Sequence, residues 1–193
     1  MIKNIIFDFG NVLAAFDPDD MLIQCTGISS QHLKDIIFQD WDHLDTGTIT
    51  YSDYKKEVLK LASETEIPLV SQFFETWITS LPPIKEIHDW IIELKEKGYH
   101  LYILSNAPVI FEEHVSAYPI TQQFDGMVFS ASIQKVKPSL DIYEYFLQKY
   151  GLKAEECFFI DDKKINIEGA IKCGIQGMVY QNNLEDIKKK VYR

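Results

Sequence analysis

The chain has 193 residues, 46% of them hydrophobic and 25% charged, which suits one core domain with a modest insertion. Its formal net charge of −10 repels nucleic acids and anionic membrane surfaces, so we expect neither as a partner. The three cysteines lack paired spacing and argue against a disulfide framework or a zinc site. Asp8 interrupts the N-terminal apolar run, so no signal peptide or membrane helix is predicted and a cytoplasmic location is expected.

The N-terminal segment "NIIFDFGNV" predicts a buried strand that ends in a carboxylate. Residues 5–7 are β-branched or aromatic, Asp8 follows them directly, and Gly10 and Asn11 end the strand. Two interpretations remain open at this point. Asp, Gly and Asn are ordinary turn residues. Alternatively, ligands of open parallel sheets bind beyond the carboxyl ends of the strands, where Asp8 would be a nucleophile or a metal ligand.

Residues 16–81, called here the helical insertion, contain helical patterns but no further buried strand. Four helices are expected, near 18–26, 29–40, 51–62 and 68–80. Thr50 or Ser52 is the candidate N-cap of the third. We expect a separate cap domain, with residues 1–15 and 82–193 forming the core; the alternative is a cover over the sheet edge. Its aromatic candidates for substrate contact are Phe16, Trp41, Tyr51 and Tyr54.

The second half of the chain alternates short apolar runs with helical patterns. Strands are predicted near 99–104, 126–130, 157–160 and 175–180. One helix pattern ends at Gly98, a second is expected to hold Pro138 in its first turn and to end at Gly151, and a third closes the chain. This alternation predicts an α/β fold with a doubly wound, Rossmann-like parallel sheet.

Polar residues stand at the expected strand ends: Ser105 and Asn106 after one strand, Asp161 and Asp162 after another, and Lys137 before a helix. Each has an ordinary interpretation as a turn, a cap or a solvated loop. Because parallel strand ends converge, these side chains are expected to share one crevice with Asp8. Such a set suits phosphoryl transfer, and its adjacent acids predict a bound cation, Mg²⁺.

The segments "FDFGNV", "LSN", "KP" and "FIDDKKINIEGA" occur in the order of the four motifs of the haloacid dehalogenase superfamily. The chain resembles the phosphatases of that superfamily, in the branch with a helical cap after the first strand. "DFGNV" and "TGTITYSDY" are most similar to bacterial sugar-1-phosphate phosphatases. The resemblance implies Mg²⁺-dependent hydrolysis of a small phosphorylated metabolite. It leaves the oligomeric state open, as a monomer or a weak dimer.

The resemblance also implies roles for individual residues. Asp8 would be the nucleophile that forms an aspartyl-phosphate. Ser105, the backbone of Asn106, and Lys137 would bind the phosphoryl group, and Lys137 would also offset the charge of Asp8.

A metal site is implied by the same motifs. Mg²⁺ would be held by Asp8, the carbonyl of Gly10 and Asp162, with Asp161 nearby. Asn166, on the following helix, would steady this acidic loop.

Gly10 departs from the family pattern, which has a second Asp there as general acid and base. Loss of such a group commonly costs on the order of 10²–10⁴ in rate. We favour a working phosphatase, because Asp8, Lys137 and the acidic pair are present. The alternatives are a weakly active or non-catalytic binding protein, and a dehalogenase-type hydrolase, which would need no metal.

Overall fold

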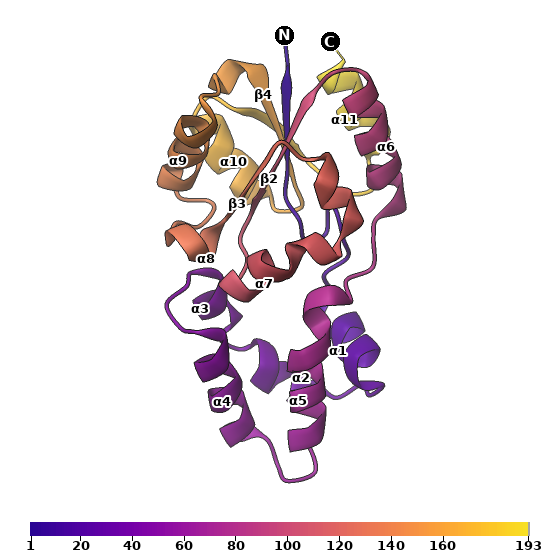
Figure 1. Ribbon diagram of the computed structural model, residues 1–193, viewed down its shortest axis with the longest axis vertical. Coiled ribbons are helices and arrows are strands. Elements are labelled where there is room, and N and C mark those ends of the chain that lie inside the picture. The colour runs from indigo at the N-terminus through magenta and orange to yellow at the C-terminus, as the bar shows by residue number, and fades with distance from the viewer. Residues whose placement is uncertain (193) are drawn as a thin grey trace.

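The computed structural model describes residues 1–192 and contains a five-stranded, wholly parallel sheet in the order β3-β2-β1-β4-β5 (Figure 1). The strands are β1 (Asn4–Phe7), β2 (His100–Ser105), β3 (Gly126–Phe129), β4 (Cys157–Asp161) and β5 (Gln176–Val179). Each corresponds to a predicted strand, so the expected doubly wound sheet is confirmed. The strand that carries Asp8 is central.

Helices cover both faces of the sheet (Figure 1). On one face lie α6 (Lys85–Glu96) and α11 (Leu184–Val191), and on the other α9 (Leu140–Tyr150) and α10 (Lys164–Lys172). The alternation of β1 side chains accounts for two separate cores. Ile5 and Phe7 belong to the core with α6 and α11, whereas Ile6 belongs to the core with α9 and α10. Because both faces of β1 are buried, residues 5–7 form a continuous apolar run.

Short helical segments that the sequence analysis did not predict fill the remaining connections. They are α7 (Val109–His114), η2 (Val115–Ala117), η3 (Pro119–Gln123), α8 (Ser130–Ile133) and η4 (Ala154–Glu156). Among residues 1–192, no helix combines the length and apolar character needed to cross a bilayer.

The prediction that Pro138 lies in the first turn of a helix is wrong. Helix α9 begins at Leu140, and Ser139 before it is extended. The backbone of Lys137 is instead held by the side chain of Asn106, which bonds both its N–H and its carbonyl group. The predicted end of this helix is confirmed, because Gly151 caps it in the left-handed conformation at φ 63°.

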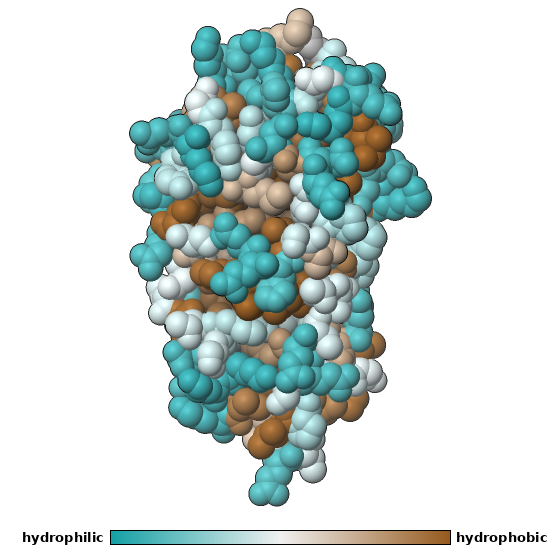
Figure 2. All heavy atoms as spheres, in the orientation of Figure 1, coloured by the Kyte–Doolittle hydropathy of each residue, from teal (hydrophilic) through white to brown (hydrophobic). Residues whose placement is uncertain are grey.

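The helical insertion lies at the carboxyl edge of the sheet, in the lower half of Figure 1. Its helices are α1 (Pro18–Thr26), α2 (Gln31–Phe38), α3 (Trp41–Asp45), α4 (Tyr51–Leu61), α5 (Ile67–Thr76) and η1 (Trp77–Thr79). The four predicted helices are present, with η1 forming the end of the one predicted over 68–80, and α3 is additional. Thr50, not Ser52, is the N-cap of α4, because its hydroxyl accepts a hydrogen bond from the N–H of Asp53. On the visible face, hydrophilic residues cover much of the upper half, and hydrophobic patches lie across the middle and on the lower half (Figure 2).

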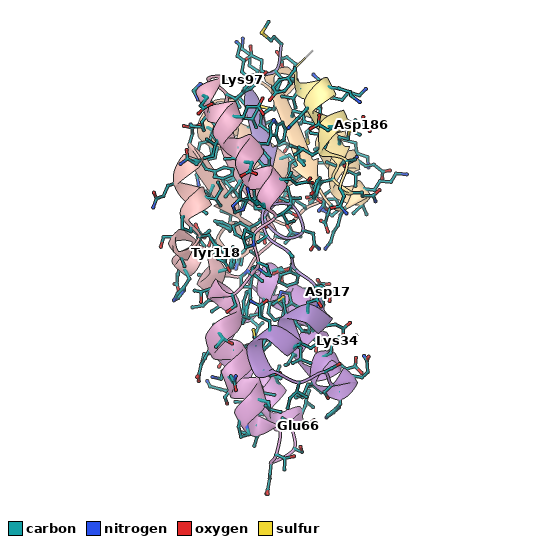
Figure 3. All side chains as sticks on the ribbon, turned by 90° about the vertical axis from the view of Figure 1, so that its right-hand side faces the viewer. Asp17, Lys34, Glu66, Lys97, Tyr118 and Asp186 are labelled. Carbon is teal, nitrogen blue, oxygen red and sulfur yellow. The ribbon has the colours of Figure 1, made fainter. Side chains whose placement is uncertain are left out.

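The two chain crossings between the sheet and the helical insertion lie side by side. The N–H of Ala15 donates to the carbonyl of Pro82 at 2.8 Å, and that of Ile84 donates to Leu13 at 3.0 Å. Beside them, the Tyr118 hydroxyl donates to Ile78 and accepts from the N–H of Leu81 (Figure 3 labels Tyr118). We retain the division into a core of 1–15 and 82–193 and a cap of 16–81 as a proposal, which these adjacent crossings support.

Candidate active site

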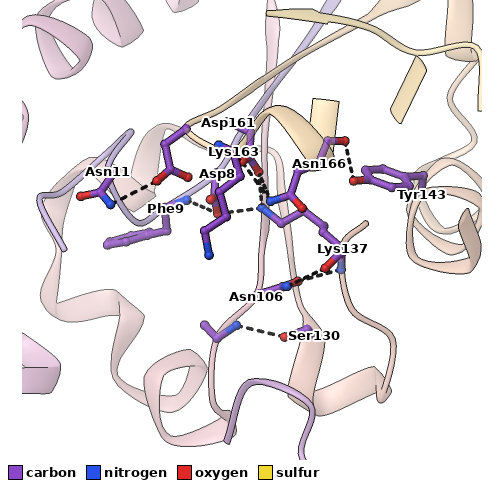
Figure 4. A network of polar contacts seen from close by, with 12 residues as sticks. Asp8, Phe9, Asn11, Asn106, Ser130, Lys137, Tyr143, Asp161, Lys163 and Asn166 are labelled. Carbon is purple, nitrogen blue, oxygen red and sulfur yellow. Dashed lines mark hydrogen bonds and ion pairs between the residues drawn. The ribbon is translucent and has the colours of Figure 1, made fainter. Parts of the chain in front are cut away.

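Lys137 lies at the centre of a buried polar network (Figure 4). Its ammonium nitrogen is 2.9 Å from Oδ1 of Asp8 and 2.6 Å from Oδ2 of Asp161, and its side chain is 0% exposed. The carboxylates come from the ends of neighbouring strands β1 and β4, as the parallel pairing requires. Burial alone would lower the pKa of Lys137, but the charges of Asp8 and Asp161 raise it above its usual value. The lysine therefore remains charged.

Asp8 is buried at the end of β1, as predicted. The N–H of Phe9 donates to its Oδ1 at 2.7 Å, which fixes the carboxylate against the backbone. Burial raises the pKa of Asp8 to about 6, an effect that Lys137 opposes and Asp161 reinforces. The group is therefore mainly ionised at neutral pH. Because it is buried, few water molecules compete with an electrophile for its oxygens.

Asp161 is fully buried, and hydrogen bonds from the protein occupy both of its oxygens. Asn166 Nδ2 lies 3.0 Å from each oxygen, and the N–H of Lys163 donates to Oδ1 at 2.8 Å. Asn166 thus contacts the acidic loop as expected, from α10. The Tyr143 hydroxyl in turn donates to the carbonyl of Asn166 at 2.7 Å. With both oxygens engaged in this way, Asp161 is placed to orient Lys137.

Asp162 is half-buried, and one of its oxygens accepts a hydrogen bond from Asn11 Nδ2 at 3.1 Å. Asn11 adopts the left-handed conformation at φ 55°, so the turn after β1 brings its amide to the acidic loop. Burial raises the pKa of Asp162 above its usual value. A bound cation would therefore stabilise the ionised form of Asp162.

The three acids together fit a small divalent cation. One oxygen each from Asp8, Asp161 and Asp162 lie within 4.8 Å of one another. Lys137 pairs with Asp8 and Asp161, and the charge of Lys163 also acts on Asp162, so three carboxylates face two lysines and an excess of negative charge remains. Carboxylate oxygens are the ligands that Mg²⁺ prefers. Gly10, the predicted carbonyl ligand, lines the same cavity.

Ser105 and Asn106 both reach the cavity from the end of β2. The Ser105 hydroxyl is buried close enough to Asp8 to lower the pKa of that carboxyl. The Asn106 side chain donates to the carbonyl of Lys137 at 3.0 Å and accepts from its N–H at 2.9 Å. It therefore positions Lys137. The sequence analysis expected only the backbone of Asn106 to act, because no local pattern reveals a partner so distant along the chain.

The cavity beside this network has about 640 Å³ of unfilled space, its open mouth included. An apolar part of its wall is lined by Phe16, Trp41, Trp77, Leu81 and Phe111. Two of the four aromatic candidates, Phe16 and Trp41, therefore lie at the cavity. The other two pack within the helical insertion, where the hydroxyls of Tyr51 and Tyr54 donate to backbone carbonyls.

Asp45, at the end of α3, also lines the cavity, and the sequence analysis missed it. Its Oδ1 is buried and has no hydrogen-bond partner among the described residues. Its backbone carbonyl accepts a hydrogen bond from the Ser130 hydroxyl at 2.5 Å. Burial raises the pKa of Asp45 to about 8, and Asp42 adds to this effect. Helical periodicity could not single it out, because α3 has only five residues.

The fold and the site together define an α/β protein with a carboxylate–lysine centre at the carboxyl edge of its parallel sheet. Residues 5–180 match the haloacid dehalogenase-like hydrolases, and the chain belongs to this family. The predictions of the family and of a hydrolase are thereby confirmed.

Two curated relatives are similar over nearly their whole length. The sesquiterpene phosphatase astK of Aspergillus oryzae is 29% identical, over 94% of this chain and 91% of the relative. The D-ribitol-5-phosphate phosphatase of Bacteroides thetaiotaomicron is 25% identical, over 96% and 95%. Among solved structures, a family enzyme of B. thetaiotaomicron in complex with magnesium and inorganic phosphate superposes with a TM-score of 0.75. It is 24% identical, over 95% of this chain and 96% of that one, and supports the fold assignment.

Proposed function

We propose that the protein is a Mg²⁺-dependent phosphatase that hydrolyses a small phosphorylated metabolite through an aspartyl-phosphate on Asp8. The observation that carries the proposal is the buried Lys137 ammonium, which contacts both Asp8 and Asp161 beside a cavity. A nucleophilic carboxylate next to a fixed positive charge is suited to attack on an anionic phosphoryl group. The phosphatase activity named for two relatives of nearly full length supports the same choice.

In this mechanism an Asp8 oxygen attacks phosphorus, and the bond between phosphorus and the ester oxygen breaks. Lys137, the Ser105 hydroxyl and the backbone N–H of Asn106 bind the phosphoryl oxygens and stabilise the charge that builds on them. Water then cleaves the aspartyl-phosphate and restores Asp8. Mg²⁺ would be held by Asp8, Asp162 and the Gly10 carbonyl, with Asp161 behind them. It would offset the charge of the phosphoryl group.

The apolar wall supports two classes of substrate. A sugar 1-phosphate, the class suggested by the sequence, would lay its ring against Trp41 or Trp77. A second candidate is a phosphate ester with an apolar organic part, because Phe16, Leu81 and Phe111 leave the wall with few hydrogen-bonding groups. The named substrate class of the relative astK is of this apolar kind.

The test is phosphate release from a panel containing sugar 1-phosphates, sugar 6-phosphates and isoprenoid monophosphates, with Mg²⁺ and with EDTA. We expect release that requires Mg²⁺ and that disappears in Asp8→Asn, because an amide is neither a nucleophile nor an anionic ligand. Asp8→Asn purified in parallel controls for contaminating phosphatases. Turnover retained in this variant would refute the role of Asp8. Halide release from a 2-haloacid without metal would favour a dehalogenase, and no release from any ester would favour a binding protein.

A further inference from the structure

Hydrolysis of an ordinary phosphate ester needs a proton donor, because the leaving alkoxide is strongly basic. The titratable side chains that line the cavity are Asp8, Asp45, Lys137, Asp162 and Lys163. Asp8 is committed as the nucleophile, Lys137 is held between two carboxylates, and Asp162 belongs to the acidic cluster. Gly10 has no side chain to offer. The sheet therefore provides no free carboxyl, and the helical insertion provides one, Asp45.

Asp45 is held firmly against the sheet domain. The Ser130 hydroxyl that donates to its carbonyl also accepts a hydrogen bond, at 3.0 Å, from the N–H of Ala107. Ala107 directly follows Ser105 and Asn106, so Asp45 is tied to the segment that reaches the phosphoryl position. The turn after α3 also packs closely against α8, because a Cβ at Gly47 would lie 2.6 Å from the carbonyl oxygen of Ala131.

The Asp45 carboxyl is also uncommitted. No described residue donates to its buried Oδ1, although a buried polar atom without a partner costs about 1–3 kcal/mol. A carboxyl with a purely structural role would be expected to find a partner in the folded protein. An unpartnered oxygen at a cavity wall instead suits a partner that arrives with the substrate.

We propose that Asp45 is the general acid and base of the reaction, in the place of the side chain that Gly10 lacks. The proposal rests on the phosphatase function above. As the Asp8–phosphorus bond forms and the phosphorus–oxygen bond breaks, the Asp45 proton passes to the leaving oxygen. In the second step the Asp45 carboxylate takes a proton from the attacking water, whose oxygen bonds to phosphorus as the Asp8–phosphorus bond breaks. Asp8 and protonated Asp45 are both regenerated.

The charges around Asp45 are consistent with this role. Burial raises its pKa to about 8, and the negative charges of Asp42 and Asp8 reinforce the effect, whereas Lys163 and Lys137 oppose it. Asp42 lies on the same helix as Asp45, and Asp8 directly follows β1. Lys163 directly precedes α10, and Lys137 lies in the loop before α9. The carboxyl therefore carries its proton at neutral pH and can lose and regain it during a cycle.

The test compares Asp45→Asn with Asp40→Asn, a matched control just before the same helix whose side chain is exposed and does not line the cavity. With p-nitrophenyl phosphate, whose leaving group needs no protonation, Asp45→Asn should give a burst of one equivalent of nitrophenolate. A slow steady state should follow, because hydrolysis of the aspartyl-phosphate lacks its base. With an alkyl phosphate the burst should vanish and turnover should fall on the order of 10²–10⁴-fold. Asp40→Asn should match the unmodified protein.

Unchanged rates on both esters in Asp45→Asn, in a protein that is otherwise active, would overturn the role of Asp45 alone. An unmodified protein that releases no phosphate from any ester would overturn the phosphatase proposal with it.

A rescue experiment separates proton transfer from a structural effect. A Cβ at Gly10 would meet its nearest neighbour, Phe16 Cβ, at 3.5 Å, an ordinary contact, so a side chain is accommodated there. In the Asp45→Asn background, Gly10→Asp should restore alkyl phosphate turnover at least tenfold, and the isosteric Gly10→Asn should not. Circular dichroism melts confirm that the variants are folded. Equal rates for the two Gly10 variants would show that the lost function is not proton transfer.

Discussion

The buried Lys137 ammonium compensates two carboxylates at once, so its removal should affect stability as well as turnover. In Lys137→Met the charges of Asp8 and Asp161 lose their partner, and we expect a loss of about 3–5 kcal/mol in the free energy of unfolding. Added Mg²⁺ should restore part of this loss. Lys135→Met is the matched control, because Lys135 pairs with Asp141 at the surface and should cost less than ~1 kcal/mol. Urea unfolding with and without Mg²⁺ measures both; equal losses would contradict the central role of Lys137.

Asp162 and Ser105 should contribute very differently to metal affinity. Asp162 offers a charged oxygen to the acidic cluster, whereas Ser105 reaches the cavity from β2 and has the proposed role of binding the phosphoryl group. We expect Asp162→Ala to weaken Mg²⁺ binding at least ~10-fold and Ser105→Ala to leave it nearly unchanged. Calorimetric titration of Mg²⁺ into both variants tests the assignment, and equal affinities would speak against it.

Asp45 should make the folded protein less stable as the pH rises. Its pKa is about 8 in the folded protein and 3.8 in a solvated chain, so the unfolded state loses the proton first. Stability therefore declines between about pH 4 and pH 8. Asp45→Asn lacks this penalty and should be more stable than the unmodified protein by ~1–2 kcal/mol at pH 8, with a smaller difference at pH 5. Unfolding in EDTA at both pH values checks this; a difference independent of pH would refute it.

At the scale of elements, the contact between α3 and α8 should set both stability and activity. Gly47 and Gly27 have similar backbone angles, φ 70° and 75°, so alanine at either position costs about 1–2 kcal/mol of backbone strain. Only Gly47 also approaches Ala131, whereas nothing lies within 4 Å of a Cβ at Gly27. Gly47→Ala should therefore cost more than Gly27→Ala and should also lower turnover, because α3 carries Trp41 and Asp45. Melting temperatures and turnover rates are measured for both variants. Equal values would show that the contact between α3 and α8 contributes to neither stability nor activity.

The sequence predicted the five strands because each is a short, mostly apolar run with turn residues beyond it, and the inner strands β1, β2 and β4 are also buried on both faces. It failed at Pro138, because the helix begins only at Leu140, and the side chain of the distant Asn106 bonds the backbone of the preceding Lys137 instead. It also missed the helical segments between Pro108 and Gln123. These are short, and two of them are 3₁₀ turns, so they lack the repeat of 3.6 residues on which such predictions depend.

For the candidate site, the sequence placed Asp8, Ser105, Lys137 and Asp161 in one crevice because strand ends converge in any parallel sheet. It could not place Asp45. That residue reaches the cavity only because a five-residue helix packs against α8, a relation between elements far apart in the sequence. The side-chain role of Asn106 was hidden for the same reason.

At the scale of the whole molecule, substrate access should require the helical insertion to move. The cavity is lined by residues from both halves, and the adjacent crossings near 14–18 and 80–84 are the expected hinges. We expect Mg²⁺ with vanadate, a phosphate mimic, to increase protection from hydrogen exchange within 16–81. Mass spectrometry of exchanged peptides reports the change, with the helix α9 as an internal reference. Unchanged protection throughout 16–81 would identify the insertion as a fixed cover.

The central position of β1 also has a consequence for synthesis of the protein. Asn4 pairs with His100 and Cys157, which both follow it far along the chain, so β1 leaves the ribosome before either neighbouring strand is available. Its apolar run must stay exposed while the whole helical insertion is translated, and its second edge stays open until β4 emerges. Such segments attract chaperones or aggregate. We therefore expect nascent chains that stop before residue 157 to be far more sensitive to proteolysis within β1 than the 193-residue chain is.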